Sequence, residues 1–351
     1  MSYQEKTFTG LACYIKGEQD LVVEQKITSI EKGHVAIKIN RGGICGSDIH
    51  YFYHGGVGDI KLQHPMLLGH EIIGTVIDSG ESQTLMVGQK VAINPSLSCG
   101  NCNYCLEGKG NHCTDMLFFG SAMRTPHIHG GFADYLSVAP MRCVPYDCNC
   151  SDKVMVFAEP LAVALHAINQ AGSLVGKNIL VSGAGPIGCL IIAAAKACGA
   201  LSVTAFDVSE KSCGLASTMG ADEVINPVDE ELLSPYLNNK GFFDISFEAS
   251  GVESALQGVI HVTKPTGIIV QVGNSRGLPG VPVMQIVAKE LTLKGTFRFC
   301  SEFNNAVRWL ETGRIDPSPL ISAELPALQI HEAIRLAADK TRSAKVQIIF
   351  N

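Results

Sequence analysis

The sequence has no long run of apolar residues, no cluster of basic residues and no apolar leader at its start. Its longest apolar stretches contain glycine and fall short of the about 18 uninterrupted residues that a membrane-spanning helix needs. The formal net charge of −6 disfavours binding to nucleic acid. The polar N-terminus lacks the hydrophobic segment of a secretory signal. We therefore expect a cytoplasmic protein that binds neither a membrane nor nucleic acid.

Cysteine, in contrast, is abundant: the chain contains 13 cysteines. The number is odd and the chain is long, which favours metal binding over disulfides. Four of these residues, Cys99, Cys102, Cys105 and Cys113, lie in one short segment. This spacing lets four thiolates surround a Zn²⁺ ion at about 2.3 Å, and a redox-active CxxC pair is the alternative. A site with four protein ligands has no open position, so the segment predicts a structural zinc.

The length of 351 residues predicts two domains. Apolar and polar residues alternate over residues 7–40, and short runs at 74–78 and 91–94 continue the pattern between glycines. These features predict antiparallel strands in an irregular barrel. Strands and helices then alternate over residues 177–298, which predicts a parallel, doubly wound sheet and an α/β fold. Residues 302–351 do not continue that alternation, and we expect them to complete the first domain.

Cys45 and His70 indicate a second metal site, because each lies between glycine-rich neighbours and both residue types bind zinc. A catalytic zinc has three protein ligands and one open position for water or substrate. The third ligand is either Glu71, which directly follows His70, or Glu159, which lies among apolar residues before a predicted helix. A carboxylate in such surroundings is unfavourable unless it is paired or bound to metal. The alternatives are a helix N-terminal charge for Glu159 and a supporting role beside the ligands for Glu71.

Ser47 and His50 follow Cys45 closely. A hydroxyl beside a metal-bound alcohol can accept its proton, and an imidazole farther out can pass that proton to water. An ordinary turn residue and a surface histidine are the alternatives.

A nucleotide loop is indicated by Gly183, Gly185 and Gly188, which form a GxGxxG pattern. The pattern follows an apolar run, opens a helical segment and precedes a second strand, as a dinucleotide-binding motif requires. Backbone without side chains can approach the pyrophosphate, and the helix N-terminus binds its charge.

Asp207 ends the next predicted strand, 19 residues after Gly188. A carboxylate at this place accepts hydrogen bonds from the ribose 2′-hydroxyl and repels a 2′-phosphate, which favours NAD over NADP. Lys211 is close enough to weaken that preference. A helix cap is the alternative role for Asp207.

Together these motifs resemble the zinc-dependent medium-chain dehydrogenases over essentially the full chain, and the Glu-Pro pair at 159–160 resembles the polyol dehydrogenase branch. The resemblance implies a GroES-like irregular β-barrel catalytic domain over residues 1–160 and 300–351 and a Rossmann domain over residues 161–299. It implies a catalytic zinc on Cys45, His70 and Glu159, a structural zinc on Cys99, Cys102, Cys105 and Cys113, and catalytic roles for Ser47, His50 and Glu71. The implied cofactor-binding residues are Gly183, Gly185, Pro186, Ile187, Gly188, Asp207, Lys211, Val272 and Gly273.

Within this branch, the segments that begin at Arg41, Cys113 and Gly295 resemble enzymes of sugar acids. The implied reaction is the NAD(P)-dependent oxidation of L-idonate to 5-dehydro-D-gluconate, with sorbitol or xylitol as alternative substrates. Arg298 matches a substrate-pocket arginine and is the first candidate for binding a carboxylate, with Arg124 the second. The other implied substrate-binding residues are Phe119 and Tyr51. Members of the family usually form dimers or tetramers, so we expect a homodimer or homotetramer.

Overall fold

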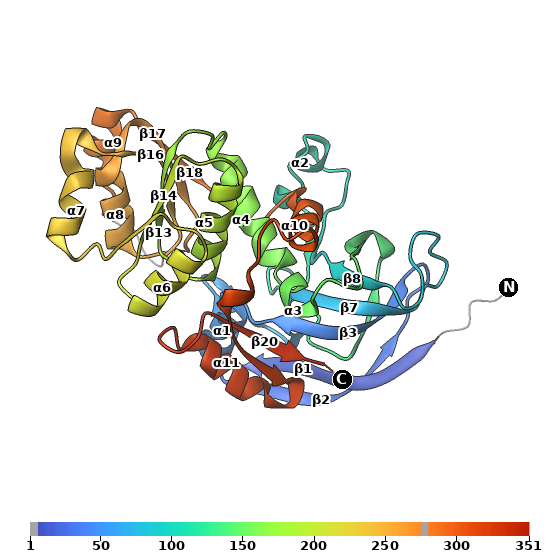
Figure 1. Cartoon of the computed structure of the whole chain (residues 1–351). Coiled ribbons are helices and arrows are strands. Elements are labelled where there is room, and N and C mark those ends of the chain that lie inside the picture. The colour runs from blue at the N-terminus through green and yellow to red at the C-terminus, as the bar shows by residue number, and fades with distance from the viewer. Residues whose placement is uncertain (1–5, 275–279, 351) are drawn as a thin grey trace. The chain divides into compact units, whose positions relative to one another are not determined.

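The chain folds into two compact units, each with its own sheets and helices (Figure 1). The computed structural model of the protein describes residues 6–274 and 280–350. The first unit comprises Met1–Glu159, Phe303–Gly313 and Ile321–Asn351, and the second comprises Pro160–Glu302 and Arg314–Leu320. The described residues nearest to the two ends of the chain therefore belong to the first unit.

The first unit is built on a seven-stranded sheet with the order β12-β8-β7-β3-β20-β19, in which β11 also pairs with β3. A three-stranded sheet, β2-β1-β6, and the ribbons β4-β5 and β9-β10 accompany it. Strand pairing is antiparallel except between β19 and β20. The strands are β1 (Thr7–Gly17), β2 (Asp20–Ser29), β3 (Val35–Gly43), β4 (Gly56–Val57), β5 (Ile60–Lys61), β6 (Met66–Leu67), β7 (Glu71–Asp78), β8 (Lys90–Ile93), β9 (Ser96–Leu97), β10 (Leu117–Phe118), β11 (Tyr135–Val138), β12 (Cys143–Pro145), β19 (Ile321–Pro326) and β20 (Lys345–Ile349).

Strand β3 is the centre of this unit, because it pairs with β7, β11 and β20. Its residues Val35, Ile37 and Ile39 are fully buried in the main apolar core, as the alternation of apolar and polar residues in this segment predicts. The helices that lie wholly in the first unit include α1 (Gly46–His54), α2 (Asn103–Leu106), α3 (Asp152–Met155) and α11 (Ile330–Ala338), and α1 and α11 contribute buried residues to this core. Strand β3 leads almost directly into α1. The backbone of the residues between them is therefore anchored to a strand that pairs with three others.

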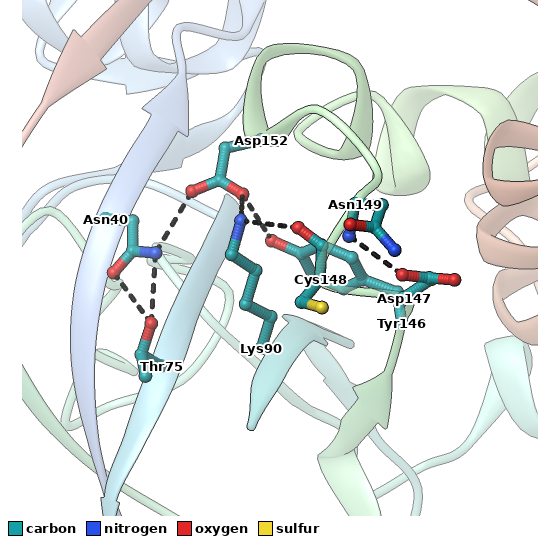
Figure 2. A network of polar contacts seen from close by, with 8 residues as sticks. All are labelled: Asn40, Thr75, Lys90, Tyr146, Asp147, Cys148, Asn149 and Asp152. Atoms are coloured by element: carbon teal, nitrogen blue, oxygen red, sulfur yellow. Dashed lines mark hydrogen bonds and ion pairs between the residues drawn. The ribbon is translucent and has the colours of Figure 1, made fainter. Parts of the chain in front are cut away.

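A polar network fixes the segment that leads from β12 to α3 (Figure 2). The carboxylate of Asp152 accepts hydrogen bonds from Lys90 at 2.8 Å, from Asn40 at 3.1 Å and from the Tyr146 hydroxyl at 3.1 Å. Asn40 also exchanges hydrogen bonds with Thr75 of β7. Three strands of the sheet thus hold α3 in place, a few residues before the start of α4.

The second unit contains a six-stranded parallel sheet with the order β15-β14-β13-β16-β17-β18. Strands β13, β14 and β15 follow one another from the middle of the sheet to one edge, and β16, β17 and β18 follow one another from the middle to the other edge. Its strands are β13 (Asn178–Ser182), β14 (Ser202–Phe206), β15 (Glu223–Ile225), β16 (Phe243–Glu248), β17 (Thr263–Gln271) and β18 (Thr292–Gly295). The helices are α4 (Ala158–Ala171), whose first two residues belong to the first unit, α5 (Pro186–Ala197), α6 (Glu210–Thr218), α7 (Glu230–Leu237), α8 (Glu253–Val262) and α9 (Val283–Lys289). Helix α10 (Glu302–Glu311) has its first residue in this unit and the rest in the first unit.

The strand order reverses between β13 and β16, which makes the carboxyl end of β13 a topological switch point. Ligands of doubly wound sheets bind in the crevice at such a point. The predicted α/β class, with an irregular antiparallel part and a doubly wound parallel sheet, is confirmed.

Candidate metal centres and nucleotide loop

Cys45 and His70 meet because of the register between β3 and β7. Gly43 at the end of β3 pairs with Glu71 at the start of β7, so the residues just outside the paired segment lie side by side. The Sγ atom of Cys45, a ring nitrogen of His70 and a carboxylate oxygen of Glu71 all lie within 4.8 Å of one another. A residue with a side chain would not fit before His70, because a Cβ at Gly69 would lie 2.0 Å from the ring of Phe132. Gly69 also has φ 92°, a left-handed conformation that residues with a side chain rarely adopt, so both the space and the backbone at this position require glycine.

The surroundings of His70 are buried and negatively charged. Its side chain is 4% exposed. Burial lowers the pKa of His70, but the charges of Cys45, Asp48 and Glu159 outweigh burial and raise this pKa to about 10. Among the described residues none forms a hydrogen bond with His70 Nδ1, although that atom is buried. A buried imidazole nitrogen, a thiol and carboxylates form a donor set that fits Zn²⁺, whose charge would offset theirs.

The two candidates for the third ligand have different surroundings. Both carboxylate oxygens of Glu71 accept a hydrogen bond at 2.8 Å from Lys345 Nζ, and both side chains are buried. Glu159, the second residue of α4, is 6% exposed, and its charge acts on His70 and on Lys345. The third ligand stays a prediction, because both carboxylates belong to the buried surroundings of His70.

Asp48 holds both ligand segments, and the sequence reading missed it. One of its carboxylate oxygens accepts the backbone N–H of Cys45 at 2.9 Å, and the other accepts that of Gly69 at 3.3 Å. The side chain is fully buried. An acidic residue three positions after Cys45, at the third position of α1, was the available signal, since it matches the carboxylate of a capping box.

Helix α1 also carries Ser47 and His50, which are both half-buried and three residues apart. Residues with this spacing lie on the same face of a helix. Phe118, which the sequence reading also missed, places its ring 5.6 Å from that of His70. It is 8% exposed and thus adds an apolar wall beside His70.

Two of the predicted substrate-binding residues, Tyr51 and Phe119, belong to the first unit. Tyr51 is buried, and its hydroxyl accepts the backbone N–H of Ala122 at 2.9 Å. The guanidinium of Arg142 lies 3.7 Å over the ring of Phe119.

The two arginine candidates for binding a carboxylate belong to different units. Arg298 is half-buried in the second unit, with its guanidinium 4.9 Å from the ring centre of Phe297. Arg124, the second candidate, is in the first unit and forms an ion pair with Asp115 at 2.8 Å. The substrate roles of Tyr51, Phe119 and the arginines stay predictions.

The four-cysteine segment forms a compact thiol cluster. Its four sulfur atoms, those of Cys99, Cys102, Cys105 and Cys113, all lie within 4.8 Å of one another. The distance is 3.5 Å between the sulfurs of Cys102 and Cys105 and 3.9 Å between those of Cys99 and Cys105. Zinc–sulfur bonds of about 2.3 Å in a tetrahedron put sulfurs about 3.8 Å apart, so the spacing fits. Hydrogen bonds from the backbone at Thr114 and Cys105 lower the pKa of Cys102 to about 6, which favours the thiolate. This cluster fits a structural zinc site.

The glycine loop follows β13 at the switch point of the parallel sheet. A Cβ at Gly183 would lie 2.6 Å from the backbone nitrogen of Ser250, and one at Gly188 would lie 1.8 Å from the carbonyl oxygen of Gly183. At both positions, neighbouring backbone atoms of the protein itself therefore leave no room for a side chain. Gly185, in contrast, has nothing within 4 Å of an added Cβ, and it precedes Pro186, the first residue of α5. Open space at a helix N-terminus suits an anionic group.

Asp207 is close to this loop, since its carboxylate accepts the backbone N–H groups of Ala184 at 2.7 Å and of Ser209 at 2.8 Å. Lys211 follows at the start of α6. The backbone N–H groups of Val272 and Gly273 bond to the carbonyl oxygen of Glu248 on the other side of the switch point. Ile187 is the second residue of α5.

The carboxylate of Glu248 itself accepts from Ser250, Gly251 and Gln271. The sequence reading missed Glu248, although an acidic residue at the end of a buried strand was a signal.

Fold and site together define a zinc-binding dehydrogenase, and the chain belongs to that family. Residues 31–147 match the alcohol dehydrogenase GroES-like domain, and residues 186–312 match the zinc-binding dehydrogenase domain. The predicted resemblance to zinc-dependent medium-chain dehydrogenases is confirmed. Among the described residues, no helix is both long enough and apolar enough to cross a membrane.

The relatives include enzymes of sugar acids and of polyols. The chain is 48% identical to L-idonate 5-dehydrogenase (NAD(P)(+)) of Escherichia coli K12, over 97% of this chain and 98% of that protein. The crystal structure of L-idonate 5-dehydrogenase from E. coli K-12 has a TM-score of 0.97 and 47% identity, covering 99% of this chain and 100% of that one. A probable D-xylulose reductase A of Neosartorya fischeri is 34% identical, over 95% of this chain and 94% of that protein.

Proposed function

We propose that the protein oxidises a secondary alcohol of a sugar acid with NAD(P), converting L-idonate to 5-dehydro-D-gluconate, and catalyses the reverse reduction. The observation that carries this proposal is the 48% identity over nearly the full length with an L-idonate 5-dehydrogenase. The probable D-xylulose reductase A is 34% identical over a similar length. The intact donor set of the half-buried Cys45 and the buried His70 supports catalysis rather than a purely structural use of the fold.

Cys45, His70 and Glu159 would hold the catalytic zinc, with Glu71 beside them, and Cys99, Cys102, Cys105 and Cys113 would hold the structural zinc. When bound, the catalytic zinc would supply a Lewis acid for the hydroxyl of the substrate, and NAD(P) would supply the hydride acceptor. Ser47 Oγ would accept the hydroxyl proton while its own proton passes to the imidazole of His50, three residues farther along α1, and His50 would release a proton to water. Asp48 keeps the two ligand segments together during this transfer.

Gly183, Gly185 and Gly188 would receive the pyrophosphate, with Pro186 and Ile187 opening α5 beneath it. Asp207 would bind the ribose hydroxyls and favour NAD, with Lys211 nearby, and Val272 and Gly273 would line the nicotinamide side of the crevice. Arg298 of the second unit would bind the carboxylate of the sugar acid through paired hydrogen bonds, and Phe119 and Tyr51 of the first unit are the other proposed substrate-binding residues.

A substrate panel tests this function. Purified, zinc-replete protein is assayed for NADH and NADPH formation with L-idonate, sorbitol and xylitol. We expect the highest kcat/KM with L-idonate and NAD. The Arg298→Ala variant should lose at least about tenfold in kcat/KM on L-idonate and clearly less on the uncharged polyols, since one charge-assisted pair is removed. A wild-type preference for sorbitol or xylitol would establish a polyol dehydrogenase instead, and equal losses on all substrates would exclude the carboxylate role of Arg298.

We infer that the protein forms a homodimer or homotetramer through the second unit. Strand β18 is the last strand of the parallel sheet, and all four of its residues are exposed. Helix α9 before it exposes Val283, Met284 and Val287. An exposed sheet edge beside apolar side chains suits pairing with a second copy of the chain. Light scattering coupled to size exclusion should give the mass of a dimer or tetramer for the wild type and a lower mass for Leu293→Lys; a monomeric wild type would refute this inference.

We further propose a cytoplasmic location. Both zinc sites use cysteine thiolates, which a reducing compartment keeps available for metal. Fractionation of cells that express the tagged full-length protein would test it, and recovery outside the cytoplasm would refute it.

A further inference from the structure

A buried polar cluster joins α4 to the first residue of α10 within the second unit. One carboxylate oxygen of Glu302, Oε1, lies 3.0 Å from His166 Nδ1 and accepts a hydrogen bond from Asn169 Nδ2 at 2.8 Å. His166 and Asn169 are three residues apart on α4 and thus share one face of that helix. Glu302 is 5% exposed, so these contacts are shielded from water.

The second oxygen of Glu302, Oε2, accepts the backbone N–H of Cys300 at 2.7 Å. Burial raises the pKa of Glu302, but the hydrogen bonds from His166, Asn169 and Cys300 outweigh burial and lower this pKa to about 2. The carboxylate is therefore ionised at neutral pH, and it connects α4 to the backbone just after Arg298.

Arg298 has an unusual backbone conformation, with φ at 53°. The left-handed region is disfavoured for residues with a side chain, and such a conformation persists where the surroundings hold it. Two restraints follow Arg298 directly: Phe299 is 1% exposed in the interior, and Cys300 is bound by Glu302. Without the bond to Cys300, the turn would lose one of these restraints, and Arg298 would relax toward commoner conformations.

We propose that Glu302 is a positioning residue for substrate binding, which holds Arg298 in the left-handed conformation through Cys300. The proposal rests on the proposed function, in which Arg298 binds the carboxylate of the sugar acid. A guanidinium pairs with a carboxylate in a planar, two-bond geometry, so a shift of the arginine backbone weakens the pair. His166 and Asn169 act on Arg298 only indirectly, because they orient the carboxylate of Glu302.

A double-mutant cycle tests this role. The Glu302→Gln variant keeps the shape of the side chain but replaces one accepting oxygen with an amino group and removes the charge. We expect its kcat/KM for L-idonate to fall about tenfold, mainly through KM, with the affinity for NAD unchanged. In the Arg298→Ala background the same substitution should change kcat/KM by less than about twofold, because the group that Glu302 positions is already absent.

Asn169→Ala, which removes a single hydrogen bond to Glu302, is a milder second variant, and we expect it to lose about threefold in the wild-type background only. If Glu302→Gln does not fold, Asn169→Ala takes its place in the double-mutant cycle. Glu311→Gln is the matched control: it lies on the same helix, and its carboxylate accepts a backbone N–H group too, that of Asp147 at 2.8 Å. This control should retain wild-type kinetics.

Equal losses in both backgrounds would mean a general structural role and would overturn the proposal. Unchanged kinetics of Glu302→Gln and Asn169→Ala, with Arg298→Ala impaired, would overturn it while leaving the proposed function intact. A wild-type enzyme that does not oxidise L-idonate would instead refute the proposed function.

Discussion

Replacing Cys45 with alanine is expected to lower kcat/KM for L-idonate by at least about 10³-fold and to lower the zinc content by one equivalent per chain. The thiol is one of only three protein ligands proposed for the catalytic ion, and His70 and one carboxylate alone would bind it weakly. The structural zinc would remain, because its four thiolates lie on a separate segment. Steady-state NADH formation and elemental analysis of the purified variant measure the two effects.

The matched control for this prediction is Cys148→Ala, which removes an exposed cysteine of the same unit. It should retain both the wild-type zinc content and the wild-type turnover, which excludes a general effect of losing a thiol. A Cys45→Ala variant that oxidises L-idonate at the parental rate would contradict the assignment of the catalytic centre. A variant that loses turnover but keeps all of its zinc would show that Cys45 acts without binding metal.

Features that are continuous in the sequence were predictable. The four cysteines span one short segment, so their spacing alone implied a common ion, and the structure gathers their sulfur atoms. The glycine loop was recognisable because the strand before it and the helix after it are adjacent in sequence. The strands of the parallel sheet were visible as separate apolar runs. Their order, with β13 beside β16, depends on packing and was not readable from those runs.

Contacts between distant segments were not predictable. Asp48 bonds to Gly69, and Lys345 bonds to Glu71, through registers that only the folded sheet fixes. The final strand, β20, contains Lys345, which is 5% exposed. A lysine on a buried strand requires a partner, which was a signal for a buried carboxylate without saying which one. The choice between Glu71 and Glu159 was open for the same reason.

The buried pair of Lys345 and Glu71 should contribute strongly to stability. Burial lowers the pKa of Lys345, but the charges of Glu71, Cys45 and Glu159 outweigh burial and raise it, so the ammonium is charged at neutral pH. Lys345 also donates to the carbonyl oxygen of Ile44 at 3.1 Å, next to the ligand Cys45 proposed above. Replacing it with methionine keeps the volume but leaves Glu71 buried without its cation. We expect the free energy of unfolding to fall by about 3–5 kcal/mol, measured by urea denaturation of the zinc-loaded protein.

Removing the carboxylate as well should reverse most of this loss. In the double variant Lys345→Met with Glu71→Gln no buried charge lacks its partner, and a neutral pair can replace an ion pair at small net change. Lys340→Met, which removes an exposed lysine near the same strand, should alter stability by less than about 0.5 kcal/mol. A single Lys345→Met variant as stable as the wild type would contradict the expected penalty. A double variant less stable than the single one would show that Glu71 is stabilised by another positive group, and the zinc held by Cys45 and His70 would then be the first candidate.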